Sequence, residues 1–114
     1  MGMDLETIYI VDDEPAVLEA LSSLLRASGK NVRLFSSGAD FLSVKRDDSP
    51  ACLILDLKMP GLNGLEVQRF VSTTIPIIFI SGRGDVDSTV KAMKGGACDF
   101  LTKPVDEALL LDAV

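Results

Sequence analysis

The stretch Ala51-Cys52-Leu53-Ile54-Leu55-Asp56 decides the fold, because five consecutive apolar residues end in a carboxylate. Such a run has no polar face, which predicts a strand buried on both sides, as in a parallel sheet covered by helices. Residues 57–64 follow with one proline and two glycines and predict a loop. Asp56 is therefore expected at the carboxyl end of a central strand, where open α/β sheets place their sites. Taken alone, this Asp could also simply cap the next turn.

Apolar runs and helical stripes alternate along the rest of the chain. Further strands are expected at Thr7 to Val11, Asn31 to Phe35, Ile75 to Ile80 and Ala97 to Leu101. Helices are expected from Pro15 to Gly29, from Gly38 to Arg46, after a capping Asn63, over Val86 to Met93, and from Asp106 to Val114. This alternation predicts one α/β domain, residues 1–114, with a parallel sheet.

The apolar residues of the helices indicate which faces turn inward. We expect the inward residues to be Phe41 and Leu42, then Val67, Phe70 and Val71, then Val86, Val90 and Met93. Cys52 and Cys98 each lie beside an apolar strand run, so both are expected as buried, reduced thiols. The last helix has only about nine residues, fewer than an isolated helix needs, so it must be stabilised by packing on the sheet. We also expect this helix to be truncated.

Composition excludes several classes of protein. The 114 residues carry a formal net charge of −6, which argues against a grip on a nucleic-acid backbone by this segment. No apolar run approaches the roughly 20 residues that span a membrane, and the N-terminus lacks the basic region of a signal peptide, so a cytoplasmic protein is expected. The chain has no histidine, which excludes Ser-His and Cys-His catalytic pairs and histidine-ligated metals.

Charged and polar residues stand at the carboxyl ends of four predicted strands, namely Asp12, Asp13, Asp56, Ser81 and Lys103. These ends share one edge of a parallel sheet, so the side chains should lie together. Three carboxylates about 5 Å apart repel one another by roughly 3 kcal/mol per pair at an effective dielectric constant near 20, and one lysine offsets only part of this. A hard divalent cation is therefore expected, Mg²⁺ first, with Mn²⁺ or another divalent cation as alternatives.

A carboxylate between a metal ion and a lysine suits phosphoryl transfer. The carboxylate can act as the nucleophile and hold the phosphoryl group as an aspartyl-phosphate. We interpret Asp56 as that nucleophile, with the Ser81 hydroxyl and the Lys103 ammonium each contacting a phosphoryl oxygen.

With these residues in this order, the chain resembles a response-regulator receiver domain over essentially its whole length. The matching residues are Asp12-Asp13, Asp56, Met59-Pro60-Gly61, Ser81, Phe100 and Lys103-Pro104. The resemblance implies a doubly wound, flavodoxin-like (βα)5 sandwich with five parallel strands in the order 2-1-3-4-5. It also implies a signalling switch rather than a turnover enzyme.

The resemblance further implies how the acidic residues act. Asp56 would accept the phosphoryl group from a phosphohistidine of a sensor histidine kinase. Asp13 and Asp56 would bind Mg²⁺ directly, together with the backbone carbonyl of Lys58, and Asp12 would act mostly through metal-bound water.

The remaining matches imply a switch. Ser81 and Lys103 would hold the phosphoryl group, and the Lys103–Pro104 peptide bond would be cis. Phe100 takes the place of the family's aromatic switch residue, often Tyr, and lacks its hydroxyl. Ser81 and Phe100 would then change conformation together after phosphorylation.

A narrower resemblance comes from the segments 82–86 and 92–100. They are similar to receivers joined to LuxR-type helix-turn-helix transcription factors. This implies an output domain absent from this chain, transcription as the output, and a phosphorylation-dependent homodimer through the fourth helix and fifth strand. The alternative is a stand-alone phosphorelay receiver without a DNA-binding output.

Three further functions stand against this interpretation. A phosphatase with an aspartyl nucleophile needs an acid two residues after it, where this chain has Lys58. A flavin- or nucleotide-binding module needs a phosphate loop after the first strand, where Asp12 and its acidic neighbours would repel phosphate. A receiver that only docks partners would not need the complete acidic set.

Overall fold

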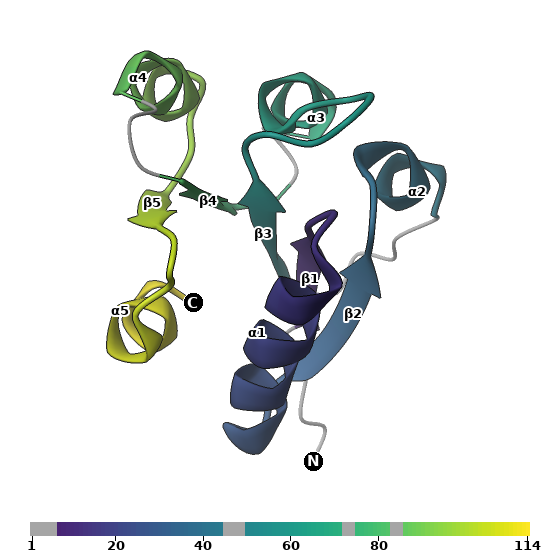
Figure 1. Cartoon of the computed structure of the whole chain (residues 1–114), viewed down its shortest axis with the longest axis vertical. Helices are drawn as coiled ribbons and strands as arrows, with labels where there is room; N and C mark the ends of the chain where they lie inside the picture. Colours follow the sequence, from purple (N-terminus) through teal and green to yellow (C-terminus); the bar gives the residue numbers. More distant parts are fainter. Residues whose placement is uncertain (1–6, 45–49, 72–74, 83–85) are drawn as a thin grey trace.

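The structure is a computed structural model that describes residues 7–44, 50–71, 75–82 and 86–114. In these ranges, strands and helices alternate along the chain (Figure 1). The strands are β1 (Thr7–Val11), β2 (Asn31–Phe35), β3 (Ala51–Asp56), β4 (Ile77–Ser81) and β5 (Asp99–Thr102). The helices are α1 (Pro15–Ala27), α2 (Gly38–Ser43), α3 (Gly64–Val71), α4 (Val86–Lys94) and α5 (Glu107–Ala113).

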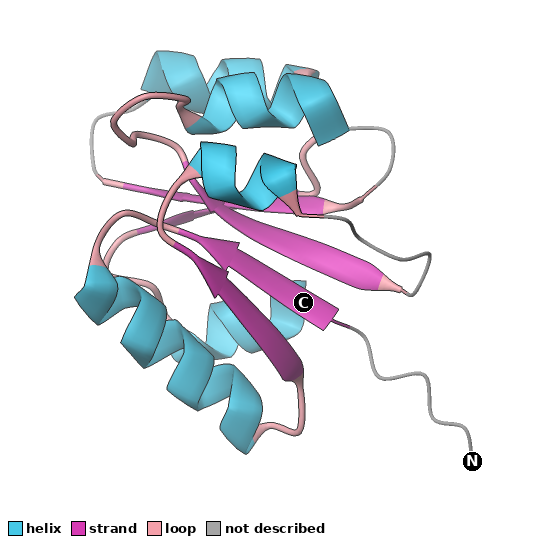
Figure 2. Ribbon diagram, turned by 90° about the vertical axis from the view of Figure 1, so that its right-hand side faces the viewer, coloured by secondary structure: helices cyan, strands magenta, loops and turns pink. Residues whose placement is uncertain are grey.

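The sheet is parallel, with the strand order β2-β1-β3-β4-β5, which confirms the predicted order. Helices α1 and α5 cover one face, and α2, α3 and α4 cover the other (Figure 1). Figure 2 shows the sheet between these two helical layers. The fold is therefore the parallel α/β domain predicted from the alternation of elements, in the doubly wound form that the resemblance implies.

The core has one apolar cluster on each face of the sheet. In β3, Leu53 and Leu55 belong to the cluster under α2, α3 and α4, whereas Cys52 and Ile54 belong to the cluster under α1 and α5. Successive side chains of a strand point to opposite faces, so an unbroken apolar run serves both clusters. The central position of β3 follows directly from this.

Local signals set several helix ends as predicted. Gly29 follows α1 with a φ of +84°, a left-handed conformation that glycine adopts without a Cβ clash. The Asn63 side chain accepts from the Glu66 N–H, and the Glu66 carboxylate accepts from the Asn63 N–H, both at 3.0 Å, which forms a capping box before α3. Asp106 caps α5 by accepting from the Leu109 N–H.

Some predicted boundaries were wrong. Strand β4 begins at Ile77 rather than Ile75 because Pro76, which has no N–H, stands before it. Strand β5 begins at Asp99, two residues after the predicted start. Helix α2 ends at Ser43 because Val44 is extended, with φ −87° and ψ 135°; the rest of its predicted span, 45–46, lies outside the described residues.

Several predicted burials were also wrong. Phe70 is 69% exposed, and Val90 and Met93 are about half exposed. On α3 the inward position beside Val67 is taken by Gln68, whose side-chain amide donates to the Ala92 carbonyl at 2.8 Å. Ala92 on α4 is likewise buried. The hydrogen bond between Gln68 and Ala92 thus occupies the inward side of α3 and α4, and the larger apolar side chains of these helices lie on the outward side.

The two cysteines differ. Cys52 is buried in β3 as predicted, but Cys98 is exposed because it lies in the loop before β5 rather than within a strand.

The start of α3 is tightly packed, and we expect Gly64→Ala to destabilise the fold by about 1–3 kcal/mol. A Cβ at Gly64 would lie 2.5 Å from the Asp56 carbonyl oxygen and 2.9 Å from the Leu57 Cα, and backbone atoms cannot move aside cheaply. Urea unfolding measures the change. Gly82→Ala is the matched control, because a Cβ there meets nothing within 4 Å; equal effects of both substitutions would contradict the steric explanation.

Candidate functional site

Four neighbouring strands deliver polar side chains to one edge of the sheet. Asp12 follows β1, Asp56 ends β3, Ser81 ends β4, and Lys103 follows β5. The pairing of Ser81 with Thr102, and the hydrogen bond from the Lys103 N–H to the Ser81 carbonyl at 2.7 Å, bring the ends of β4 and β5 together. The parallel sheet therefore gathers residues that are up to 91 positions apart (103 minus 12).

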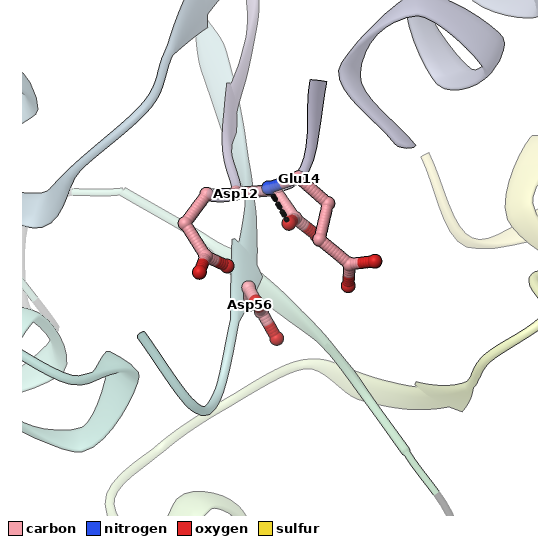
Figure 3. Close-up of side chains that lie close together, drawn as sticks. Asp12, Glu14 and Asp56 are labelled. Carbon is pink, nitrogen blue, oxygen red and sulfur yellow. Dashed lines mark hydrogen bonds between the residues drawn. The ribbon is translucent and has the colours of Figure 1, made fainter. Parts of the chain in front are cut away.

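The acidic residues form a compact cluster. Asp12 and Asp56 are buried, at 0% and 3% exposure, whereas Asp13 and Glu14 are exposed. Each of these four residues offers a carboxylate oxygen, and these oxygens all lie within 4.8 Å of one another. Figure 3 shows the side chains of Asp12, Glu14 and Asp56 close together. This is the acidic set that the sequence predicts, with Glu14 added.

Within the part of the chain that the structure describes, Lys103 is the cation that faces this cluster. Its Nζ lies 2.9 Å from Glu14 Oε1, 3.0 Å from Asp12 Oδ2 and 3.5 Å from Asp56 Oδ2. The Lys103–Pro104 peptide bond is cis. One ammonium facing three carboxylates leaves the site with net negative charge.

The Asp12 carboxylate has one oxygen without a hydrogen-bond donor. Its Oδ1 accepts from the Glu14 N–H at 2.8 Å (Figure 3). Its buried Oδ2 accepts no hydrogen bond within the described part of the chain, although the Lys103 ammonium stands 3.0 Å away as an ion-pair partner. A buried oxygen in this condition favours a further positive charge beside it.

The pKa values reflect the same excess of negative charge. The pKa of Asp56 is raised to about 7, mainly by burial and also by the Asp12 charge, although Lys103 and a hydrogen bond from the Lys58 backbone N–H act in the opposite direction. Burial lowers the pKa of Lys103, but the hydrogen bond to Glu14 and the contacts with the Asp12 and Asp56 carboxylates outweigh this and hold that pKa above its usual value. Lys103 therefore stays charged, while Asp56 is the group whose ionisation the site resists.

The donor set fits a hard divalent cation. Carboxylate oxygens are the ligands that Mg²⁺ prefers, and the cluster has more negative charge than Lys103 balances. The Lys58 backbone lies next to this cluster, since its N–H bonds the Asp56 carboxylate. The residues that would hold such an ion are therefore in place.

The two predicted switch residues occupy different settings. Ser81 is buried at the site edge, 1% exposed. Phe100 is half-buried in β5 and packs against Phe79 with ring centroids 6.4 Å apart. Phe100 thus lies on the sheet face covered by α2, α3 and α4, three residues before Lys103 in the chain.

Sequence reasoning missed the contact of Glu14 with Lys103. The sequence showed Glu14 only as the third acid in a row after the first strand. The available signal was that acids follow the first strand and a lysine follows the fifth. Only the strand order of the sheet shows that Glu14 and Lys103 come into contact.

Comparisons with known proteins identify the family of this chain. The chain matches the response regulator receiver domain family over residues 8–114. It is 54% identical over 110 residues to response regulator protein TmoT of Ectopseudomonas mendocina, covering 94% of this chain and 50% of that protein. It is 44% identical to nodulation protein W of Bradyrhizobium diazoefficiens, covering 94% of this chain and 48% of that protein.

Solved structures show the same fold. Response regulator StyR superposes with a TM-score of 0.88 at 43% identity, covering 96% of this chain and 57% of that one. The FixJ-N crystal structure superposes with a TM-score of 0.88 at 37% identity, covering 99% and 91% of the two chains.

Fold, site and family match together define a signalling phosphoacceptor domain rather than a catalytic enzyme. The chain belongs to the response regulator receiver domain family. It spans about half the length of the curated relatives it matches. Among the described residues, no helix is long and apolar enough to cross a membrane.

The buried Asp56 carboxylate makes stability depend on pH in metal-free buffer. An Asp with a pKa of about 7 when folded and 3.8 when unfolded destabilises the fold by roughly 4 kcal/mol once it is ionised in both states. Its folded pKa is raised, so this loss begins as pH rises past 3.8 and is complete above about 7. We expect Asp56→Asn to be more stable than the unsubstituted protein by about 2–4 kcal/mol at pH 8, and by little at pH 4.

Urea unfolding of both proteins at several pH values, with EDTA present, measures this difference. Asp40→Asn, which removes an exposed carboxylate from α2, serves as the control and should show little pH-dependent change. A gain in stability for Asp56→Asn that is the same at pH 4 and pH 8 would show that ionisation is not its cause.

Proposed function

We propose that this domain accepts a phosphoryl group on Asp56 from a phosphohistidine of a sensor histidine kinase. The observation that carries the proposal is the Asp56 carboxylate itself. It is buried at the end of the central strand, with Oδ2 3.5 Å from the Lys103 ammonium and inside a cluster of acids. A carboxylate in this setting can attack phosphorus while the lysine ammonium stabilises the negative charge of the phosphoryl oxygens.

In the transfer, an Asp56 oxygen forms a bond to phosphorus as the bond from phosphorus to the donor imidazole nitrogen breaks. The electron pair of that bond leaves with the imidazole. Lys103 pairs with one phosphoryl oxygen, and the buried Ser81 hydroxyl donates to another. Ser81 ends β4, the strand that pairs with β3, and Lys103 Nζ lies 3.5 Å from Asp56 Oδ2, which supports this division of roles.

Mg²⁺, or Mn²⁺ in its place, would be held by Asp13, Asp56 and the backbone carbonyl of Lys58, with Asp12 acting through water. When bound, the ion supplies positive charge that neutralises the acids and the transferring phosphoryl group. The buried Asp12 oxygen that lacks a hydrogen-bond donor supports a cation at this place.

Phosphorylation then drives a change of shape. The phosphoryl group carries a charge of about −1.5 to −2 and replaces the single negative charge of the Asp56 carboxylate. The Ser81 hydroxyl moves toward the phosphoryl group, Phe100 turns further inward, and the surface made by α4 and β5 changes. Phe100 is only half-buried and packs on Phe79, so its ring has room for such a movement at the edge of the core.

The surface of α4 and β5 would then bind a second copy of the chain. Val90 and Met93 expose apolar surface on α4. Lys91 and Lys94 lie in the last turn of that helix, and the exposed Asp99 begins β5. Apolar surface flanked by charges of both signs supports a self-complementary contact.

The whole protein would control transcription from the cytoplasm. Transcriptional regulatory protein FixJ of Rhizobium meliloti is 38% identical over 111 residues, and this chain covers 54% of it. We infer that residues 1–114 form the receiver half of such a regulator and that a DNA-binding output domain belongs to the same protein.

The phosphoacceptor role is tested by intact mass after treatment with a small phosphodonor, with and without Mg²⁺. We expect one added phosphoryl group in the presence of Mg²⁺ and none in Asp56→Asn. Asp40→Asn, an exposed acid on α2, should be labelled like the unsubstituted protein. Labelling of Asp56→Asn to the same extent would refute Asp56 as the acceptor.

Coupling to dimerisation is tested with Ser81→Ala. This variant should accept phosphate but dimerise less, because the hydroxyl that responds to the phosphoryl group is absent. Sedimentation of the phosphorylated proteins measures the dimer, with Ser23→Ala on the exposed side of α1 as the control. Normal dimerisation of phosphorylated Ser81→Ala would contradict the proposed switch.

A further inference from the structure

Glu14 has a side-chain contact that its place in the fold does not require. It is the N-cap residue of α1, with extended backbone (φ −95°, ψ 112°), yet its carboxylate makes no capping hydrogen bond. An Asp, Asn, Ser or Thr at this position would ordinarily accept from an N–H of the first turn, whereas Glu is not a usual capping residue. Here Oε1 instead accepts from Lys103 Nζ at 2.9 Å, 89 positions further along the chain.

This contact competes with the rest of the site for one ammonium. Lys103 Nζ is closer to Glu14 Oε1 than to Asp56 Oδ2, at 2.9 Å against 3.5 Å. The Glu14 side chain is 60% exposed, whereas that of Asp56 is 5% exposed. The ammonium thus lies between the exposed Glu14 and the buried Asp12, 3.0 Å from Asp12 Oδ2, and farther from the carboxylate that would carry the phosphoryl group.

The Glu14 backbone acts on the same site. Its N–H donates to Asp12 Oδ1 at 2.8 Å, while its side chain holds Lys103. One residue therefore orients both a buried acid and the lysine that faces it. Removing only the side-chain charge leaves the backbone contact to Asp12 intact.

We propose that Glu14 is a positioning residue that holds Lys103 in the unphosphorylated domain and competes with the phosphoryl group on Asp56 for that ammonium. This inference rests on the proposed function of Asp56. Transfer requires Lys103 to shift from Glu14 toward a phosphoryl oxygen. Glu14 thereby favours the unphosphorylated form.

Glu14→Gln tests this competition, because it keeps the length of the side chain and removes its charge. At saturating Mg²⁺ and limiting small phosphodonor, we expect the variant to be phosphorylated about two- to fivefold faster, the range for loss of one partly exposed ion pair. Glu19→Gln is the matched control. It removes the same charge from an exposed position of α1, and its rate should equal that of the unsubstituted protein.

A second measurement needs no phosphorylation. In unphosphorylated, metal-free protein, side-chain ¹⁵N NMR reports on each lysine ammonium, and Lys103→Arg identifies the Lys103 signal by its loss. We expect that signal to shift in Glu14→Gln and to stay in place in Glu19→Gln. A purely structural role of Glu14 in α1 would not move it selectively.

Three results would overturn the inference. The first is that Glu14→Gln matches the unsubstituted protein in both measurements. The second is equal acceleration by Glu14→Gln and Glu19→Gln, which would show a general charge effect. The third is a slower Glu14→Gln variant, which would show that the Glu14 charge assists the transfer rather than competing with it. Should Asp56→Asn be labelled normally, the proposed function fails, and the NMR comparison alone decides whether Glu14 holds Lys103.

Discussion

The charge balance between two buried carboxylates and one lysine, at the edge of the sheet, determines what the site of this domain can bind. Asp12 and Asp56 are almost fully removed from water, and among the described residues Lys103 is the cation that stands within 3.5 Å of both. A buried carboxylate needs a partner to remain ionised. A single ammonium shared among several acids meets that need only in part, so the site favours the arrival of further positive charge or of a proton.

The parallel sheet makes this arrangement possible. Every strand of a parallel sheet ends at the same edge, so residues from β1, β3, β4 and β5 meet without any long loop. The apolar run of β3 supplies both core clusters and also carries Asp56 at its end. The hydrophobic effect that stabilises the sheet is therefore the same force that holds the carboxylate out of water.

Much of this could be predicted from the sequence, because it depends on patterns along the chain. Apolar runs located the strands, and the polar residues at their ends located Asp12, Asp56 and Lys103. What could not be predicted depends on contacts between distant segments. Gln68 lies in an inward position because its amide donates a hydrogen bond to the Ala92 carbonyl of another helix. No residue near Gln68 in the sequence indicates that partner.

A backbone hydrogen bond joins the two ends of the loop between β3 and α3. This contact affects which segments can move when Asp56 changes. The Gly64 N–H donates to the Leu57 carbonyl at 2.9 Å, and the absence of a Cβ lets Gly64 rest on the Asp56 backbone. The first turn of α3 is thereby clamped to the strand end. A structural change that begins at the Asp56 side chain is therefore not expected to move the start of α3. It is expected to displace other segments beside Asp56 instead.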